Sequence, residues 1–321
     1  MILVVLGHAI QITIRDDCYT NHLWNIIYSF HMPAFVAVSG YFAFRPFAKS
    51  SGEGRLELGT TMTRRIRQLI IPFLIWTTIS LLINNKLTFS TFVSYLVIPD
   101  DGLWFLWVLF FINVLFLIVT YIFKKINYPE EIGILGMCLI LTLIMVLFEI
   151  RVFGFQFIAF YFLFYCMGYA IHKYYEMVKT NNIFVLLIIA IVWGFLAWNW
   201  KMSEPPTFLD GIPVPSALML YGYRFITACA AIYLLLMVAP RVLNNQHHLN
   251  TLISTFGGVS LGIYAVHYLV IANAFGFCNR QGYEIPLIVL ITFISGVLIT
   301  WGIVFVLNMV PQARKILLGK I

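Results

Sequence analysis

Charged side chains are scarce in this sequence. Only 10% of its 321 residues are Asp, Glu, Lys or Arg, whereas 61% are hydrophobic. Because a soluble globular protein carries about a quarter charged residues, this composition excludes an ordinary water-soluble fold. The formal net charge of +7 comes from basic residues that flank apolar runs and form no continuous basic face. We therefore expect a chain embedded in the lipid bilayer, with no nucleic-acid partner.

Motifs for metal binding, redox chemistry and secretion are also missing. The five cysteines form no CxxC pair and no Cys/His spacing typical of zinc sites, so we expect no metal ion. The first apolar run lacks a preceding basic segment and carries His8 in its middle, which predicts a retained helix rather than a cleavable signal peptide. No internal repeat, low-complexity tract or Gly/Ser linker divides the chain, which predicts one integral membrane domain over residues 1–321.

Long hydrophobic runs, in contrast, are abundant and indicate the fold class. A helix needs about 20 apolar residues to cross the hydrocarbon layer, and ten runs approach this length. The sequence therefore predicts an all-α, polytopic transmembrane bundle of about ten helices. A further apolar segment, 89–98, is too short to cross and is expected to lie at the interface or to re-enter. The predicted spans are 1–14, 22–44, 66–84, 103–123, 132–148, 154–172, 183–200, 217–238, 252–275 and 285–309.

The basic residues predict the orientation of these spans. With the amino terminus inside, 14 of the 20 Lys and Arg residues would lie on the cytoplasmic side, as membrane insertion favours. Five, including Arg151, would lie on the opposite side. An even number of spans preserves this asymmetry, so both termini are expected in the cytoplasm. The first span would reach only about 21 Å at 1.5 Å per residue, and we expect a start further upstream, a truncated chain or a locally thin site.

Four ionisable side chains within the predicted spans are candidates for function, because their burial in lipid is costly. They are His8, His31, Arg224 and His267. The first two could lie at similar depths on neighbouring helices and face each other. Each imidazole could instead bond a backbone carbonyl and merely hold helices together. Pro33 removes a helix hydrogen bond near His31, which either adjusts the packing or opens a cavity.

A polar stripe and an aromatic run could line a cavity for substrate. Ser260, Tyr264 and His267 follow at i, i+4 and i+7 and so share one helix face. Together with Arg224 they are candidate cavity-lining residues, although interhelical hydrogen bonding would explain them equally well. The run from Leu103 to Trp107 could be an interfacial anchor or a substrate platform.

Three arginines immediately precede the third predicted span: Arg64, Arg65 and Arg67. Such clusters commonly set topology. They could also bind the phosphates of coenzyme A at a cytoplasmic entrance, because guanidinium groups pair bidentately with phosphate. Arg64 and Arg67 are three residues apart on a helix and are expected to act together, with Arg65 pointing elsewhere.

In their order and spacing, these motifs resemble the membrane acyltransferase family 3 over essentially the whole chain. The second and third motifs are similar to the branch described as fucose 4-O-acetylases and related sugar O-acetyltransferases. The segments that carry the resemblance are Leu6-Gly7-His8-Ala9, Phe30-His31-Met32-Pro33, Ser39-Gly40-Tyr41-Phe42, Arg64-Arg65-Ile66-Arg67, Ile71-Pro72-Phe73, Trp104-Phe105-Leu106 and Ser260-Leu261-Gly262-Ile263-Tyr264-x-x-His267.

The resemblance implies an enzyme that moves an acyl group, usually acetyl, from cytoplasmic acyl coenzyme A to a hydroxyl of a cell-surface or envelope carbohydrate. It implies a multi-pass protein of the bacterial inner membrane. His8 matches the catalytic histidine of the first helix, His31 matches a second motif position and is a further catalytic candidate, and the three arginines match residues implicated in handling the acyl donor. We expect His8 to act as general base, because an unperturbed imidazole titrates near neutrality.

The sequence also allows two alternative functions. Family members usually carry an acidic residue and an Arg or Lys before the first-helix histidine, and this sequence lacks both, which would suit a truncated, noncatalytic member. A transporter or flippase of an envelope glycolipid would also explain buried His and Arg residues in about ten helices. Paired broken helices or inverted repeats would favour transport, and neither is evident.

Overall fold

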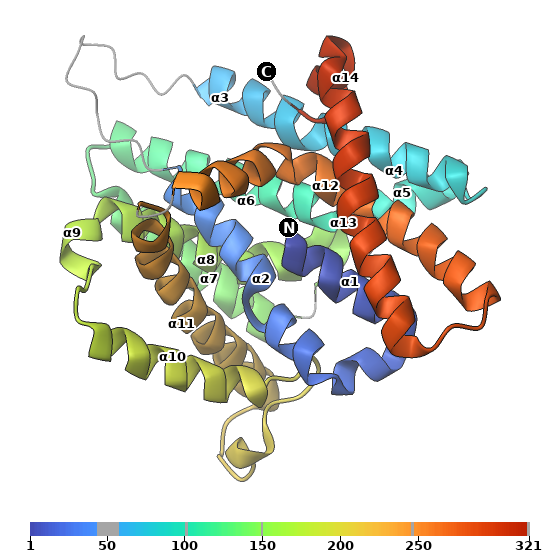
Figure 1. The fold of residues 1–321 in the computed structure, drawn as a ribbon. Coiled ribbons are helices and arrows are strands. Elements are labelled where there is room, and N and C mark those ends of the chain that lie inside the picture. The colour runs from blue at the N-terminus through green and yellow to red at the C-terminus, as the bar shows by residue number, and fades with distance from the viewer. Residues whose placement is uncertain (44–57, 100–101, 149, 245–246, 320–321) are drawn as a thin grey trace. The chain divides into compact units, whose positions relative to one another are not determined.

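A computed structural model describes residues 1–43, 58–99, 102–148, 150–244 and 247–319, and Figure 1 shows their course. Within these ranges every regular element is a helix. Seven of the described helices are long and apolar enough to cross a membrane, and Ile183–Trp198 is a shorter apolar helix. The predicted fold class, an all-α polytopic membrane protein, is confirmed. The basic residues Arg45, Lys49 and Arg55, which contributed to the predicted orientation, lie outside the described ranges.

Each of the ten predicted spans coincides with a helical stretch. Short elements fill several connections, and α5 has only nine residues, as expected for a segment too short to cross. The elements are α1 (Ile2–Ile14), η1 (Arg15–Thr20), α2 (His22–Tyr41), α3 (Leu58–Arg65), η2 (Ile66–Ile70), α4 (Ile71–Ile83), α5 (Phe89–Val97), α6 (Trp104–Lys125), α7 (Glu130–Leu147), η3 (Val152–Gly154), α8 (Phe155–Lys173), α9 (Tyr175–Val178), α10 (Ile183–Trp198), η4 (Thr207–Leu209), α11 (Ser216–Asn244), α12 (His247–Arg280), α13 (Ile285–Met309) and α14 (Pro311–Leu317).

The third helical stretch begins earlier than the sequence predicted. Elements α3, η2 and α4 are continuous. Together they form an apolar helix that covers Gly59–Ile83. In η2 the backbone widens to a π-helical turn, in which the amide of Ile71 bonds the carbonyl of Ile66. This widening precedes Pro72, whose ring would clash with a regular α-helical turn before it. The arginines therefore lie within this helix and not ahead of it.

The chain separates into two compact units, each built from sequence-distant parts. Unit 1 contains residues 1–35 and 175–306. Within it α1 packs against α12, and α10 packs against α11. Helix α13 packs closely against α1 and α12, since a Cβ added at Gly296 would lie 2.8 Å from Val5 Cγ1 and 2.9 Å from Ile271 Cγ1. The prediction of a single domain stays a prediction.

An aromatic core fills another part of unit 1. Trp24, Trp200 and Tyr223 are buried in one cluster with Ile10 and Cys18. The Tyr223 hydroxyl donates to the carbonyl of Leu196 at 2.5 Å, which satisfies its polar end. This core anchors the start of α2 and thereby fixes the helix that carries the second histidine motif.

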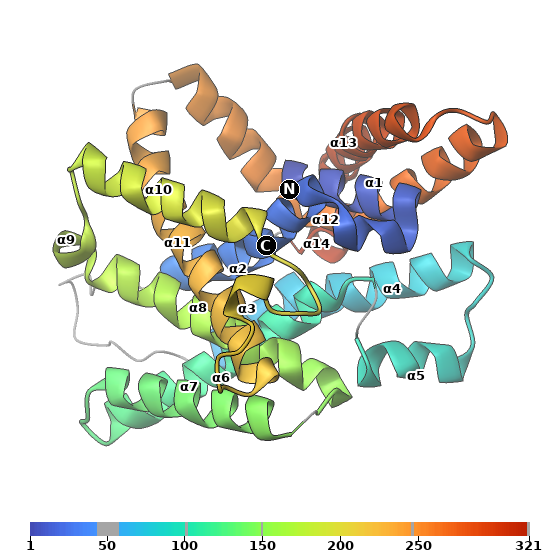
Figure 2. The same ribbon diagram turned by 90° about the horizontal axis from the view of Figure 1, so that it is seen from below.

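Unit 2 contains residues 36–174 and 307–321. Its centre is formed by α6, α7 and α8, which pack on one another and lie side by side in Figure 2. Glu130 at the start of α7 pairs with Lys173 at the end of α8 at 2.7 Å and with Lys124 at the end of α6 at 3.1 Å. This ion-pair group ties three helix ends together. Helix α14 lies against α4, where Trp76 Nε1 donates to the carbonyl of Leu317 at 2.9 Å.

Candidate functional site

His8 is held by its own helix and by α2 within unit 1. Its Nδ1 lies 3.2 Å from Oε1 of Gln11, and the Tyr28 hydroxyl donates to the same oxygen at 2.8 Å. A carbonyl oxygen only accepts hydrogen bonds, so this arrangement places the imidazole proton on Nδ1. Nε2 of His8 is left with its lone pair, which is the form that a general base requires.

His267 comes from α12 and lies next to His8. The two ring centroids are 5.2 Å apart, and His267 is only 3% exposed. Its Nδ1 contacts the carbonyls of Ile263 at 3.0 Å and Tyr264 at 2.8 Å, so this nitrogen is the donor. Its Nε2 is buried and has no hydrogen-bond partner among the described residues. A buried acceptor without a partner is costly, and this nitrogen is free to accept a hydrogen bond from a donor that enters the site.

His31 lies in the same unit, but Tyr28 is the residue whose ring contacts it. The Tyr28 ring is 4.6 Å from the His31 ring and 6.4 Å from the His8 ring. His31 is 4% exposed, and its Nδ1 donates to the carbonyl of Ile27 at 2.8 Å. From the sequence, His8 and His31 could face each other. In the structure, the Tyr28 ring contacts both of their rings. All three imidazoles have Nδ1 engaged.

Gln11 and Tyr28 were not predicted as site residues from the sequence. Gln11 follows His8 by three residues within an apolar helix, and this spacing alone makes the two side chains neighbours. Tyr28 precedes His31 by the same spacing. A search for polar residues one turn from each intramembrane histidine would have found both, although the hydrogen bond between them depends on the packing of α1 against α2.

The residues of the polar stripe in α12 have different surroundings. Tyr264 is 4% exposed and its ring centroid lies 5.9 Å from that of His267, so these two residues share a face as expected. The Ser260 hydroxyl donates to the carbonyl of Gly257 at 2.8 Å within its own helix. Tyr264 and His267 therefore belong to the histidine cluster, whereas the Ser260 hydroxyl serves the backbone.

Arg224 in α11 lies against the aromatic core of unit 1. Its guanidinium carbon is 5.5 Å from the centroid of the Trp200 ring, a cation–π arrangement. Trp200 shares its cluster with Trp24, which stacks on Tyr28 with ring centroids 3.8 Å apart. Arg224 is thus connected to the histidine cluster through aromatic rings.

The three arginines lie in unit 2. Arg64 and Arg65 are half-buried, whereas Arg67 is exposed. The π-helical turn begins at Ile66, directly after Arg65, and the expected joint action of Arg64 with Arg67 stays a prediction. Nε of Arg64 is buried and has no hydrogen-bond partner in the described part of the chain. A guanidinium nitrogen with an unused donor inside an apolar helix fits an anionic ligand.

Metal ligands do not gather in the residues that the structure describes. Within the described ranges no group of three or more His, Cys, Asp or Glu side chains could hold a metal ion.

Comparisons with known proteins assign the chain to a family. It matches a family described as an acyltransferase domain over residues 1–306. It is similar to the nodulation protein NolL of Sinorhizobium fredii (strain NBRC 101917 / NGR234), with 38% identity over 79 residues that cover 24% of this chain and 20% of that protein. The nodulation protein NolL of Mesorhizobium japonicum (strain LMG 29417 / CECT 9101 / MAFF 303099) is 28% identical over 127 residues, covering 37% of this chain and 32% of that protein.

The matches thus span a third or less of the length of these curated relatives. No solved structure matches the chain. The family match, in contrast, includes both the first-helix histidine and the late polar stripe. Because it extends over residues 1–306 of 321, this chain belongs to the acyltransferase domain family, as an integral, multi-pass membrane member.

Proposed function

We propose that this protein transfers an acyl group, in the first instance acetyl, from cytoplasmic acyl coenzyme A to a hydroxyl of a cell-surface or envelope carbohydrate or glycolipid. Its place would be the bacterial cytoplasmic membrane. The observation that carries the proposal is the hydrogen-bond arrangement around His8, in which Gln11 engages Nδ1 and leaves Nε2 as a proton acceptor beside His267. Membership of an acyltransferase family supports the reaction class.

In the proposed reaction Nε2 of His8 removes the proton from the acceptor hydroxyl while the hydroxyl oxygen attacks the thioester carbonyl carbon. A carbon–oxygen bond forms, the carbon–sulfur bond breaks, and the leaving thiolate takes the proton from the His8 imidazolium. The products are an O-acyl ester and free coenzyme A. The unpartnered Nε2 of His267 would accept a hydrogen bond from the acceptor molecule and orient it, and the Tyr264 hydroxyl is the candidate donor to the developing oxyanion. His31 would position Tyr28, whose ring it contacts.

The proposal assigns the donor phosphates to the arginines of unit 2. We expect Arg64→Gln to raise KM for acyl coenzyme A by about 10- to 100-fold, because a hydrogen bond to a charged group contributes about 1.5–3 kcal/mol. Arg64→Lys should recover only part of this loss, since an ammonium group cannot pair bidentately. The measurement is the initial rate against donor concentration for protein in lipid nanodiscs.

A control for this experiment is Arg280→Gln. Arg280 is exposed at the end of α12, and its Nε donates to the carbonyl of Gly276 at 3.0 Å. This variant should keep the wild-type KM. An unchanged KM in correctly folded Arg64→Gln protein would remove Arg64 from the donor site.

The role of Gln11 can be tested separately from folding. We expect Gln11→Leu to lower kcat by about 10- to 100-fold with little change in KM for the donor, because Nδ1 of His8 loses the acceptor that fixes its protonation. Gln11→Glu keeps an acceptor oxygen and should restore part of the rate. Asn273→Leu is the control, since Asn273 is exposed and its amide donates within its own helix. Equal rates for the Leu and Glu variants would contradict a positioning role.

The proposed function itself is tested by two measurements. Purified protein in nanodiscs should release the thiol of coenzyme A only when acyl donor and envelope oligosaccharide are both present. Mass spectrometry of surface glycans should show one ester mass that disappears when the gene is deleted. No thiol release with intact protein, together with a glycolipid retained on the inner leaflet in the deletion strain, would support the flippase alternative.

A further inference from the structure

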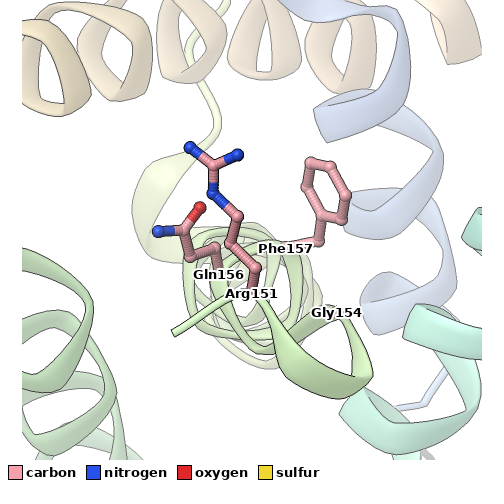
Figure 3. Close-up of a pocket in the computed structure, with 4 residues that line it drawn as sticks. All are labelled: Arg151, Gly154, Gln156 and Phe157. Carbon is pink, nitrogen blue, oxygen red and sulfur yellow. The ribbon is translucent and has the colours of Figure 1, made fainter. Parts of the chain in front are cut away.

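A small cavity lies in unit 2 at the turn that leads into α8. It has a volume of about 200 Å³ and is lined by Arg151, Gly154, Gln156 and Phe157. Figure 3 shows the side chains of Arg151 and Gln156 extending together, with the ring of Phe157 facing them from the side. None of these residues belongs to the histidine cluster or to the arginines assigned to the donor. The cavity therefore needs its own explanation.

The turn that shapes the cavity is fixed by α6. Phe153 and Gly154 have positive φ angles of 55° and 70°, which turn the chain within η3 directly before α8. A Cβ at Gly154 would meet Pro99 Cγ at 3.0 Å, so both the conformation and the space require glycine. Nε1 of Trp107 donates to the carbonyl of Phe153 at 3.2 Å and holds the turn in place. The cavity wall is thus a defined structure.

One aromatic ring, that of Phe157, lines the cavity, and it belongs to a group of neighbouring rings. The Phe157 ring lies 4.7 Å from the Trp104 ring and 6.4 Å from the Tyr161 ring, and Trp104 lies 5.6 Å from Tyr161. Phe157 and Gln156 are half-buried, and Arg151 is exposed. A hydrogen-bonding arginine and glutamine therefore stand beside a cluster of flat apolar rings.

This combination suits a sugar ring. A pyranose presents C–H groups on its faces and hydroxyls around its edge, so it can lie against an aromatic ring while its edge meets polar groups. Gln156 can both donate and accept, and the Arg151 guanidinium offers a fork of donors for neighbouring oxygens. The volume is smaller than the roughly 300–1,000 Å³ of sites for drug-sized ligands, which limits the occupant to about one sugar unit.

We propose that the Arg151–Gln156–Phe157 cavity binds a sugar unit of the carbohydrate acceptor. The identity of the ligand as the acceptor rests on the proposed function. The predicted orientation puts Arg151 on the side away from the cytoplasm, from which an envelope carbohydrate approaches. An interfacial aromatic anchor would explain Trp104 and Tyr161, but it requires neither a cavity nor paired Arg and Gln side chains.

The test uses full-length protein in nanodiscs without acyl coenzyme A. The probe is the oligosaccharide released from the producing cells' envelope and de-esterified with mild alkali, and binding is followed by saturation-transfer NMR and calorimetry. We expect Arg151→Leu, Gln156→Leu and Phe157→Ala each to weaken binding at least tenfold and to raise KM for this acceptor. KM for acyl coenzyme A should be unchanged. Gln281→Leu, at an exposed glutamine of unit 1, is the control and should bind as the wild type does.

Each outcome separates this inference from the proposed function. Variant-sensitive oligosaccharide binding by a protein that never consumes acyl coenzyme A would support the cavity and reject acyl transfer. Acyl transfer with an acceptor KM that the three variants leave unchanged would overturn the cavity proposal alone. Variants that lower only thermal stability in anionic nanodiscs, with wild-type sugar binding, would identify a membrane anchor and also overturn it. Absence of binding by the wild type would overturn it directly.

Discussion

Replacement of His8 by Gln is expected to lower kcat for acyl transfer by about 100- to 10,000-fold, the usual contribution of a general base. Glutamine has about the size of the imidazole and can still hydrogen-bond, but it cannot take up a proton. His8→Ala should be at least as inactive, and the acyl donor should bind either variant with unchanged affinity. The measurements are thiol release at saturating donor and acceptor, and equilibrium binding of acyl coenzyme A.

The matched control is His22→Gln in the same unit. His22 is exposed at the start of α2 and stacks on Trp198 with ring centroids 4.3 Å apart, outside the histidine cluster. It should keep wild-type turnover. Full activity in either His8 variant, with normal membrane expression, would reject His8 as the base while leaving the family assignment untouched.

Gly168→Ala is expected to cost unit 2 about 3 kcal/mol or more in the free energy of unfolding, at the upper end for an overpacked contact. A Cβ at Gly168 of α8 would overlap the carbonyl of Ala37 in α2. Reciprocally, a Cβ at Gly40 would overlap the carbonyl of Tyr165. The two backbones are in direct contact, and neither carbonyl can move without displacing its helix. Gly40 and Gly168 thus permit the close approach of α2 and α8.

The measurement is the midpoint of unfolding in a denaturing-detergent titration, followed by tryptophan fluorescence. Gly194→Ala in α10 is the control, because nothing lies within 4 Å of a Cβ at that position. It should be neutral or stabilising by up to about 1 kcal/mol, as expected for Gly to Ala in a helix. Equal midpoints for the two variants would mean that α2 and α8 do not rely on this contact.

The histidine cluster could be predicted from the sequence only in part. His8, His31 and His267 were identifiable because ionisable groups within apolar runs are unusual. That Tyr28 contacts both His8 and His31 could not be predicted, because the rotation of α2 about its axis depends on the aromatic core around Trp24. Similarly, the π-helical turn from Ile66 to Ile70 could not be predicted, because such a turn has no simple composition rule.

By itself the sequence determined the membrane environment, the all-α class and the positions of the ten helical runs. Length and hydrophobicity are local properties of a segment, and a long apolar segment enters the bilayer as a helix. It also supplied the family resemblance that the match over residues 1–306 confirmed. Only the tertiary structure decided which helices meet. His8 and His267 become neighbours because α1 packs against α12, and His8 and Tyr28 share the side-chain oxygen of Gln11 because α1 and α2 meet at one rotation. Such contacts depend on the fit of side chains from distant segments, which no local pattern encodes.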